Sequence, residues 1–241
     1  MRYAIIADIH GNLEALNEVL NVCRQEGVRR IFCAGDVVGY GANPRECLDI
    51  IRQRNIVCVA GNHDWAACGK IPTDNFNREA AQAVAWTAKQ LQRDELDFLK
   101  NLGLVYRNEH FILVHGSLHR PEQFIYLTDV LRAADSFFLM DRPVCFIGHT
   151  HVPAVMVKDE EETFNDEQRT FNIDTHKKYI VNVGSVGQPR NYSPTASFCI
   201  FDPDLGRLEL KAASYDVETA QQKILAAGLP NILATRLAVG T

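Results

Sequence analysis

Two hydrophobic patterns alternate along the chain. Short runs that are mostly apolar, typical of strands covered on both faces, occupy residues 4–6, 30–33, 56–59, 111–114, 144–147 and 179–183. Between several of these runs, apolar residues recur every three or four positions, as they do on a helix that buries one face. Strands that alternate with amphipathic helices predict an α/β fold built in layers.

Start and stop signals delimit the first two helices. The spacing predicts a helix over residues 12–26, with leucines on one face and Gly27 as its end. The next helix is predicted to begin after Asn43 as N-cap, because Pro44 suits the first helical position and Glu46 can close a capping box. These two helices lie between the first three predicted strands.

Further helices are predicted in the middle and at the end of the chain. The stretch between residues 65 and 103 is rich in Ala, Gln and Leu and predicts two helices with a break around residues 72–75, and residues 128–140 predict another. The sequence contains no internal repeat, low-complexity tract or clear linker. It therefore predicts one domain over residues 1–241, with a helical insert near 65–103 and closing helices near 216–239.

The remaining strands are predicted to form hairpins. Residues 152–157 and 170–173 flank the acidic segment 159–162, which we interpret as a solvated hairpin tip. Residues 197–201 and 207–212 are joined by a turn-rich segment and predict a second hairpin. The acidic run is thus assigned to the surface rather than to a binding site.

Composition and charge narrow the functional classes. The chain has 241 residues, of which 46% are hydrophobic and 23% charged, as in ordinary globular proteins. Its net charge of −5 argues against a broad nucleic-acid-binding face, and no apolar run reaches the ~20 residues that span a bilayer. Seven cysteines without a CxxC pair argue against a disulfide scaffold. We therefore expect a cytoplasmic protein, in a compartment that keeps thiols reduced, with no membrane contact.

Polar clusters follow five of the predicted strands. They place Asp, Asn and five of the eight histidines just past the carboxyl ends of the strands, where open α/β sheets bind their ligands. The clusters are Asp8-Ile9-His10, Gly35-Asp36, Gly61-Asn62-His63-Asp64, His115-Gly116 and Gly148-His149-Thr150-His151. A single histidine or aspartate at such a place is commonly a packed side chain or a turn former. Five clusters at equivalent strand ends indicate a common binding site.

The donor types in these clusters indicate divalent transition metals. Side chains two positions apart in an extended segment point the same way, so we expect Asp8 and His10 to act as one pair and His149 and His151 as another. Imidazoles mixed with carboxylate and amide oxygens suit Mn, Fe or Zn better than Ca or Mg. Seven donors exceed what one ion takes from a protein, so two ions that share the Asp36 carboxylate are predicted. Such a pair suits hydrolytic phosphoryl transfer.

The order of these motifs resembles that of the calcineurin-like metallophosphoesterase superfamily. The family series is D-x-H, G-D, G-N-H-[DE], a later H and G-H-x-H, and the clusters match it in order over residues 8–151. Segments 40–44, 181–185 and 189–190 look like the small bacterial and archaeal phosphodiesterase branch. The resemblance implies a four-layer αββα sandwich of two mixed β-sheets flanked by helices. It also implies a metal-dependent phosphodiesterase that acts on a small phosphoester or nucleotide.

The resemblance implies a role for each matching residue. One ion would be held by Asp8, His10, Asp36 and His151, and the other by Asp36, Asn62, His115 and His149. A hydroxide that bridges the two ions would be the nucleophile. His63 would bind no metal and would stabilise charge or protonate the leaving oxygen, and Asp64 would orient His63.

The sequence departs from the phosphoprotein phosphatases of the same superfamily. Their motifs continue as G-D-x-V-D-R-G and G-N-H-E-x-R, and neither arginine is present here. Since paired arginines clamp a phosphomonoester, their absence favours a phosphodiesterase over a protein phosphatase. Arg190 is a candidate substitute phosphate contact, with a surface salt bridge as the alternative. Tyr40 and Trp65 are candidates for stacking on a base or an aryl leaving group, or else they form pocket wall or core.

Three other functions stay open at this point. A phosphomonoesterase and a dinucleoside-polyphosphate hydrolase would use the same residues, and rates on bis(p-nitrophenyl) phosphate and p-nitrophenyl phosphate separate the first of them from a phosphodiesterase. A non-enzymatic scaffold with this fold would have eroded ligands, whereas all seven donors and His63 are present.

Overall fold

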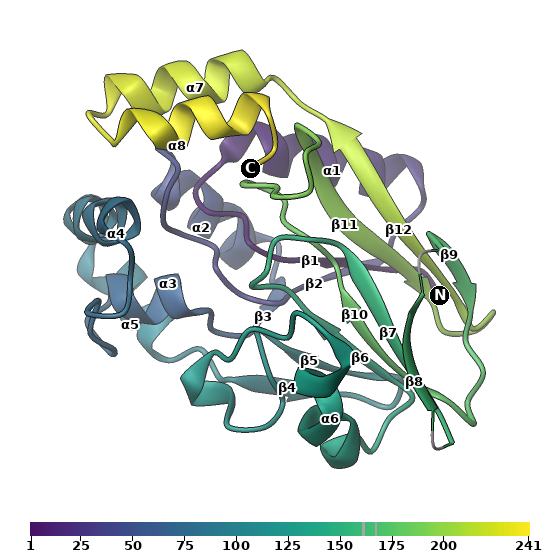
Figure 1. The fold of residues 1–241 in the computed structure, drawn as a ribbon. Helices are drawn as coiled ribbons and strands as arrows, with labels where there is room; N and C mark the ends of the chain where they lie inside the picture. The colour runs from purple at the N-terminus through teal and green to yellow at the C-terminus, as the bar shows by residue number, and fades with distance from the viewer. Residues whose placement is uncertain (161, 167) are drawn as a thin grey trace.

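Two mixed β-sheets pack face to face at the centre of the molecule, and helices cover their outer faces (Figure 1). The structure is a computed structural model that describes residues 1–160, 162–166 and 168–241. Among these residues, the first sheet has the strand order β3-β2-β1-β11-β12-β9 and the second has the order β4-β5-β6-β10-β7-β8. The predicted four-layer αββα sandwich is confirmed.

Each sheet combines parallel with antiparallel strands. In the first sheet β1, β2 and β3 run parallel, and β11, β12 and β9 follow in antiparallel pairs. In the second sheet β5, β6 and β10 run parallel, with antiparallel β4 on one side and β7 and β8 on the other. The strands are β1 Tyr3–Ile6, β2 Arg30–Cys33, β3 Val57–Cys58, β4 Val105–Arg107, β5 Phe111–Val114, β6 Val144–Ile147, β7 Ala154–Asp159, β8 Glu162–Asp166, β9 Thr170–Asn172, β10 Lys178–Asn182, β11 Thr195–Asp202 and β12 Arg207–Ser214.

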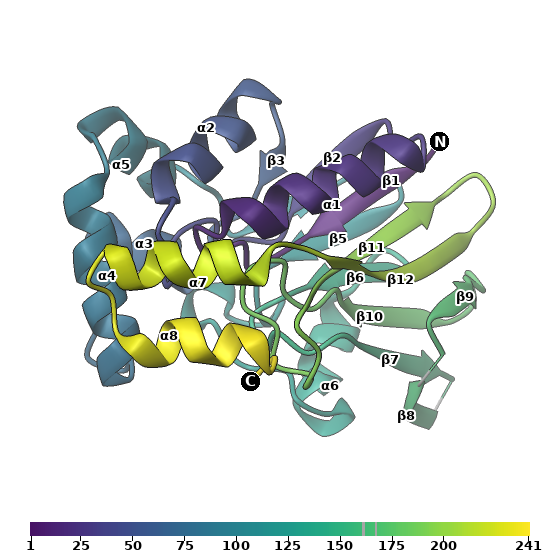
Figure 2. The ribbon, with the colours of Figure 1, turned by 90° about the horizontal axis from the view of Figure 1, so that it is seen from above.

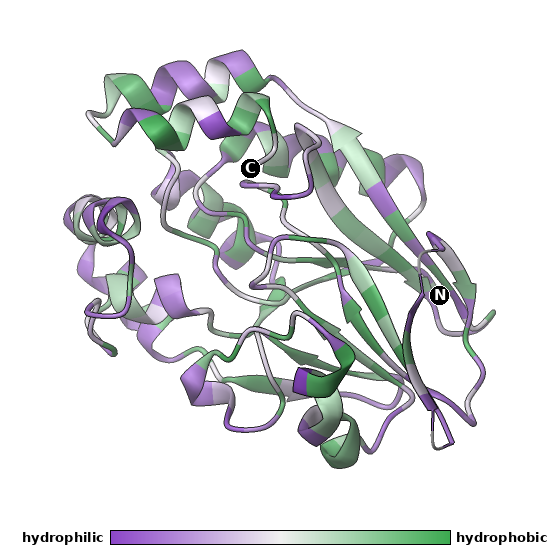
Figure 3. Cartoon of the chain, in the orientation of Figure 1, coloured by the Kyte–Doolittle hydropathy of each residue, from purple (hydrophilic) through white to green (hydrophobic). Residues whose placement is uncertain are grey.

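Alternate residues of the central strands face two different cores. In β1, Tyr3 and Ile5 face the other sheet, whereas Ala4 and Ile6 pack beneath the outer helices. Because side chains alternate across a strand, a strand that is covered on both faces must be apolar throughout. This explains the short apolar runs of the sequence, and Figure 3 shows them as hydrophobic strands in the middle of the fold.

The helices cover both outer faces and one end of the sandwich (Figure 2). α1 and α2 pack on the first sheet, and α6 packs on the second. The helices are α1 Leu13–Gln25, α2 Pro44–Gln53, α3 Asn62–Ala67, α4 Arg78–Gln90, α5 Arg93–Lys100, α6 Val130–Leu139, α7 Val217–Ala226 and α8 Asn231–Thr235, with short 3-10 turns η1 at Pro121–Gln123 and η2 at Arg236–Ala238. Of the helices formed by the described residues, none combines the length and the apolarity needed to cross a membrane.

The hairpin predicted around the acidic segment forms, but one of its two strands was assigned wrongly. β7 pairs with β8, whereas β9, which was expected to close that hairpin, belongs to the other sheet and pairs with β12. This pairing sets Phe171 opposite Leu208 and buries both side chains between the sheets, and burial of that apolar area favours it. The acidic run lies where β7 turns into β8, and its residue 161 is outside the described residues.

Two helix predictions also need correction. Two helices were predicted in the stretch 65–103, but the structure has three, α3, α4 and α5, the first of which begins just before it. The break expected around residues 72–75 separates α3 from α4. Asn43 and Pro44 start α2 as predicted, but the capping box is not formed. The Asn43 N–H donates to Gly11 O at 2.9 Å, so it is not free for Glu46, which accepts from Asn43 Nδ2 instead. The division into one domain with an insert stays a prediction.

Candidate active site

The five polar clusters meet where the two sheets end together. The clusters after β1, β2 and β3 come from the first sheet, and those after β5 and β6 come from the second. Because the strands within each set run parallel, their carboxyl ends lie at one edge. Three overlapping groups of possible ligand atoms, each within 4.8 Å, join the clusters: Asp8, His10 and His151; His10, Asp36 and His63; and Asp36, His115 and His149.

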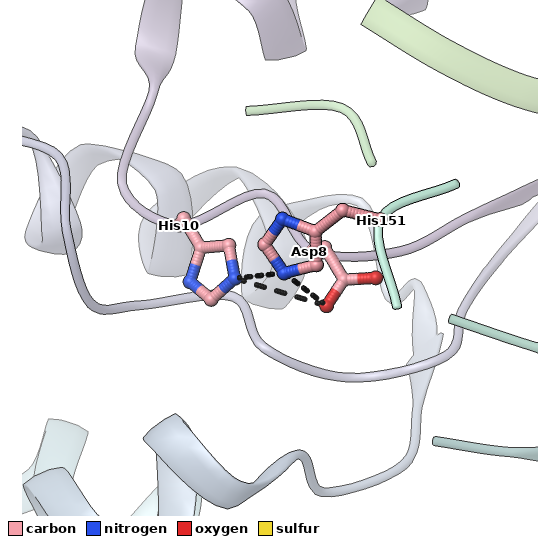
Figure 4. Close-up of side chains that lie close together, drawn as sticks. All are labelled: Asp8, His10 and His151. Carbon is pink, nitrogen blue, oxygen red and sulfur yellow. Dashed lines mark hydrogen bonds and ion pairs between the residues drawn. The ribbon is translucent and has the colours of Figure 1, made fainter. Parts of the chain in front are cut away.

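The first group lies between the segments that follow β1 and β6 (Figure 4). His10 Nε2 is 3.1 Å from His151 Nε2, and Asp8 Oδ1 is 3.4 Å from His151 Nε2 and 3.7 Å from His10 Nε2. All three side chains are buried. Three donor atoms from two sheets therefore converge on a point that one cation could occupy.

Asp36 connects this group to the second. Its Oδ2 atom is 3.7 Å from His10 Nε2 and 3.3 Å from His115 Nε2. His115 Nε2 in turn is 3.0 Å from His149 Nδ1 and 3.2 Å from Asn62 Oδ1. One carboxylate oxygen thus faces both groups, which is the position of a ligand shared by two ions.

Backbone carbonyls fix which nitrogen of three imidazoles is free. The distances are 3.0 Å from His10 Nδ1 to Val38 O, 2.7 Å from His115 Nδ1 to Ala34 O and 2.6 Å from His151 Nδ1 to Gln188 O. Since a carbonyl oxygen can only accept, each Nδ1 carries a proton, and in a neutral imidazole Nε2 then carries a lone pair. The lone pairs of His10 and His151 then face each other at 3.1 Å. A hydrogen bond cannot satisfy that pair, whereas a cation can.

The two carboxylates are held in the same way, by one oxygen each. Asp8 Oδ2 accepts from the His149 N–H and Asp36 Oδ1 from the His63 N–H, both at 2.9 Å. Asp8 Oδ1 is buried without a partner among the described residues. A buried acceptor with no donor costs free energy unless something binds it. The free oxygens and the free nitrogens together fit a divalent transition metal site.

The backbone at the site is strained rather than extended. Asp8, His10, Asp36, His149 and His151 all have positive φ angles, of 54°, 49°, 55°, 71° and 63°. We expected extended backbone to align Asp8 with His10 and His149 with His151, and this expectation is wrong. Residues in this left-handed region cost of order 1–3 kcal/mol each and cluster at functional sites. In each pair the two left-handed residues are separated by one residue. Asp8 and His10 share a ligand group, whereas His149 and His151 belong to different groups.

Burial keeps most of the imidazoles neutral. It lowers the pKa of His10 and of His149 well below the usual value and also lowers the pKa of His151. A neutral imidazole is the form that binds a metal. His115 differs: burial lowers its pKa, but the neighbouring Asp36 carboxylate raises it to about 10. Burial likewise raises the pKa of Asp36, but His115 and other imidazoles hold it well below the usual value.

Asp64 does not orient His63 as predicted. Among the described residues, its carboxylate accepts from the backbone N–H groups of Gly61, Asp36 and Val37, at 3.0, 2.8 and 2.9 Å, and from a fourth N–H at 3.2 Å. Burial raises the pKa of Asp64 to about 7, while N–H donors favour its ionised form. Asp64 therefore fixes the segment that carries Asp36.

His63 lies beside His10 and Asp36 and has an unused ring nitrogen. Its Nδ1 atom is buried and has no partner among the described residues. Its ring makes a tilted contact with Tyr40 and an edge contact with Phe76, with centroids 4.5 and 4.9 Å away. Burial lowers its pKa to about 4. His63 also belongs to one of the three ligand groups, together with His10 and Asp36, so distance alone does not separate a catalytic from a ligand role.

A cavity of about 790 Å³ opens onto the ligand groups. Asn62, His63 and His149 lie on its wall together with Tyr40 and Arg190. Arg190 donates to Gln188 Oε1 at 2.8 Å and to the Tyr40 hydroxyl at 3.4 Å, and its buried Nε has no partner among the described residues. Both residues therefore lie where the sequence predicted substrate contacts, although their role stays a prediction.

Trp65 lies away from this cavity. It is not among the described residues that line it, and its ring packs edge-on against Phe124 at 5.6 Å with Lys70 Nζ 3.7 Å from its centre. Only 7% of Trp65 is exposed. The α3 helix turns this side chain into the core, so the stacking role expected for Trp65 is wrong and the core alternative holds.

Sequence reasoning missed two contributors to the site. Tyr126 stacks on the His149 ring, with centroids 3.7 Å apart and planes 15° apart, and it lines the cavity. Gln188 supplies the carbonyl that fixes His151 and the amide oxygen that holds Arg190. Tyr126 lies in a loop that carries no sequence motif. Gln188 acts on His151 through its backbone carbonyl, which every residue has, so the residue type could not reveal that contact. The only signal for Gln188 in the sequence is its position two residues before Arg190.

Comparisons with known proteins find the same family that the order of the motifs indicates. A family model described as the calcineurin-like phosphoesterase superfamily domain matches residues 1–206. An uncharacterized protein of Methanocaldococcus jannaschii is 40% identical over 98% of this chain and 97% of its own length. Phosphodiesterase YfcE of Escherichia coli is 24% identical over 85% of this chain and 89% of its own length.

A solved structure shares the fold over the full length. A metallophosphoesterase from Sphaerobacter thermophilus superposes with a TM-score of 0.88, at 39% identity, over 100% of this chain and 99% of that chain. A hypothetical protein from Pyrococcus horikoshii superposes with a TM-score of 0.81 at 18% identity, and this more distant likeness shows the fold alone.

Proposed function

The chain belongs to the calcineurin-like phosphoesterase superfamily, whose members are hydrolases, and we propose that it is a phosphodiesterase that uses two divalent metal ions to hydrolyse a small phosphate diester. The observation that carries the proposal is the pair of imidazole lone pairs that face each other at 3.1 Å beside an unpartnered carboxylate oxygen. Such an arrangement is stable only around a cation.

The ligand assignment follows from the free atoms. Asp8, His10, Asp36 and His151 would hold one ion, and Asp36, Asn62, His115 and His149 would hold the other. Mn, Fe and Zn all suit this mixture of imidazole and oxygen donors. Bound there, the two ions would supply Lewis-acid activation of the ester and lower the pKa of the attacking water.

The chain's own residues position the ester and the leaving group. Arg190 extends a guanidinium with a buried, unpartnered Nε into the cavity wall, where it can donate to a phosphoryl oxygen. His63 presents an unpaired ring nitrogen beside the same cavity and donates an N–H to the phosphoryl or leaving oxygen. A single arginine, in place of the two that clamp a phosphomonoester, favours a diester, which carries one negative charge fewer.

We further propose that the enzyme acts in the cytoplasm. All seven cysteines are free, burial raises the pKa of Cys23 and Cys145 to about 12, and burial also raises the pKa of Cys199. Thiols that stay reduced and unreactive suit a reducing compartment.

Metal content and substrate preference test the proposal. Protein reconstituted with Mn²⁺ should hold close to two equivalents by elemental analysis and hydrolyse bis(p-nitrophenyl) phosphate faster than p-nitrophenyl phosphate. Asp36→Asn should lose metal and lower the rate by more than about 100-fold, since it removes charge from a ligand of both ions. Asp94→Asn, at an exposed carboxylate on α5, is the matched control. Trace metal only, or equal rates for both variants, contradicts the proposal.

A second variant separates catalysis from metal binding at His63. His63→Gln keeps a polar group of similar length and should lower turnover by about 10²- to 10⁴-fold while two metal equivalents remain. Loss of one equivalent in this variant would make His63 a ligand, as its distance to His10 and Asp36 allows.

A further inference from the structure

The cavity in front of the ligand groups is far larger than a phosphate group. Its volume of about 790 Å³ falls in the range of sites that enclose a whole small molecule, ~300–1,000 Å³. Only one part of its wall, with Asn62, His63 and His149, belongs to the candidate catalytic groups. The rest of the wall must therefore receive another part of the substrate.

Several aromatic rings line that wall, and two of them, Tyr126 and Phe76, lie against imidazoles of the site and beside the amide side chains of the cavity. Tyr126, between η1 and α6, stacks on His149 with centroids 3.7 Å apart and planes 15° apart. Phe76, between α3 and α4, contacts His63 edge-on at 4.9 Å. Both rings line the cavity, although 50 residues separate them in the sequence. Their convergence beside the reacting centre gives the cavity an aromatic entrance.

The Tyr126 ring has one free face. His149, beneath it, is 4% exposed, whereas Tyr126 is 46% exposed. Since the imidazole covers one face and the residue lines the cavity, the exposed area is the face turned toward the cavity. A large apolar ring left half exposed beside a polar centre offers a stacking platform.

Amide side chains accompany the rings. Asn75 and Gln123 line the same cavity, and each carries both a donor and an acceptor. Aromatic faces combined with amides are the groups that recognise nucleobases, by stacking on the ring and by hydrogen bonds to its edge. Alkyl esters would use neither group.

We propose that Tyr126 is a specificity-determining residue whose free face stacks on the nucleobase of a nucleotide diester held at the metal site. The inference rests on the proposed phosphodiesterase function and names its substrate class. Stacking on an aromatic side chain accepts any base, so the proposal predicts a preference for nucleosides over other alcohols rather than for one base.

Equilibrium binding tests the stacking without catalysis. Adenosine 5′-monophosphate and ribose 5-phosphate carry the same phosphate and sugar and differ in the base. Mn²⁺-loaded protein should bind the first at least about tenfold more tightly in isothermal titration, and Tyr126→Leu should remove that difference. Tyr126→Phe, which keeps the ring, should retain it. Phe138→Leu, at an aromatic residue 84% exposed on α6, is the control outside the cavity.

Two esters with one leaving group test the same point in turnover. Thymidine 5′-(p-nitrophenyl phosphate) and methyl p-nitrophenyl phosphate differ only in the retained alcohol. Tyr126→Leu should lower kcat/KM for the first ester about tenfold more than for the second, with the difference in KM, because stacking is binding shared by ground and transition states. If Tyr126 only held His149 in place, metal content and both rates would fall together, and that result would overturn the proposal.

The outcomes distinguish this inference from the function on which it rests. Equal affinities of the wild-type protein for the two monophosphates would overturn the stacking role even in an active phosphodiesterase. A clear preference for adenosine 5′-monophosphate, lost in Tyr126→Leu, would support the nucleoside subsite even if neither diester were hydrolysed, while contradicting the proposed phosphodiesterase.

Discussion

Glycines in the ligand motifs act by leaving room for carboxylates. A Cβ atom at Gly61 would lie 2.0 Å from Asp36 Oδ1, and one at Gly148 would lie 2.4 Å from Asp8 Oδ2. Real Cβ atoms do not approach oxygen so closely. Both glycines are therefore required by the fixed position of a neighbouring ligand, and the G-N-H and G-H-x-H patterns follow from that contact.

Gly61→Ala should damage the site without preventing folding. Gly61 has a φ of −98°, which alanine adopts freely, so the cost arises from the contact with Asp36 alone. We expect the free energy of unfolding to fall by about 1–3 kcal/mol. Because the added methyl group displaces a metal ligand, the variant should also bind fewer than two metal equivalents and hydrolyse substrate at least about tenfold more slowly. Gly103→Ala, where nothing lies within 4 Å of the added atom, should match the wild type. Full metal binding by both variants would show that the carboxylate can shift at no cost.

Burial of His63 predicts an acid-dependent stability. Its pKa falls to about 4 in the folded chain because burial disfavours the charged ring, whereas an unfolded histidine titrates near 6.5. Between these values the unfolded chain binds the extra proton. The stability due to the neutral ring is thus present above about pH 6.5 and is lost as the pH falls toward about 4, by about 1.4 kcal/mol per unit.

Urea unfolding of the metal-free chain at about pH 7 and about pH 5.5 measures this effect. His63→Gln should lose less stability across that interval than the wild type, by about 1–2 kcal/mol. His176→Gln, at an exposed histidine outside the site, should behave as the wild type. An equal acid dependence in all three proteins would mean that His63 is solvated in solution.

The segments after the strands are tied together as one element. His10 N–H donates to Asp36 O at 3.0 Å, and Gly187 N–H donates to Asp8 O at 2.9 Å. Asn12, the N-cap of α1, accepts from Ala15 N–H at 3.1 Å and donates from Nδ2 to Gly187 O at 2.9 Å. The start of α1 is therefore fixed to the segment whose next carbonyl, that of Gln188, holds His151.

Asn12→Ala should affect both stability and activity, whereas an ordinary cap affects stability alone. Loss of the cap costs about 1 kcal/mol, and loss of the bond to Gly187 loosens the carbonyl that orients His151. We expect at least a severalfold lower rate in addition to a lower urea midpoint. Asp216→Ala removes the cap of α7, whose carboxylate accepts from Thr219 N–H at 2.9 Å, and should lower the midpoint only. Unchanged activity in Asn12→Ala would separate α1 from the site.

Local signals explain which elements were predictable. The apolar strands and the starts of the first two helices depend on neighbours in sequence, and they were predicted with small errors in their ends. The partner of β9 and the Asp64 contacts depend on residues far away in the chain, so periodicity could not reveal them. The same holds for Tyr126, whose importance comes from a stack on His149. Motif spacing identified the ligand residues but gave the wrong backbone conformation for them.

At the scale of the whole molecule, the candidate metal site spans both halves of the sandwich. The first sheet supplies Asp8, His10 and Asp36, and the second supplies His115, His149 and His151. Two of the three ligand groups draw atoms from both sheets. Without cations, the neutral imidazoles of His10 and His151 repel each other across this boundary, so metal binding and sheet packing must be coupled.

Metal removal should therefore destabilise the entire fold rather than one loop. A ligand at about one hundred times its dissociation constant stabilises a protein by about 2.7 kcal/mol. For a chain of this size such a change shifts the Tm by about 5–10 °C. We expect a single thermal transition that rises by this amount when Mn²⁺ is added to EDTA-treated protein, with most of the shift lost in Asp36→Asn and kept in Asp94→Asn. If the transition stayed in place when Mn²⁺ was added, or shifted equally in Asp36→Asn, the cation would not be bound by these ligands in the folded chain, because any ion held by the folded chain alone must raise the transition.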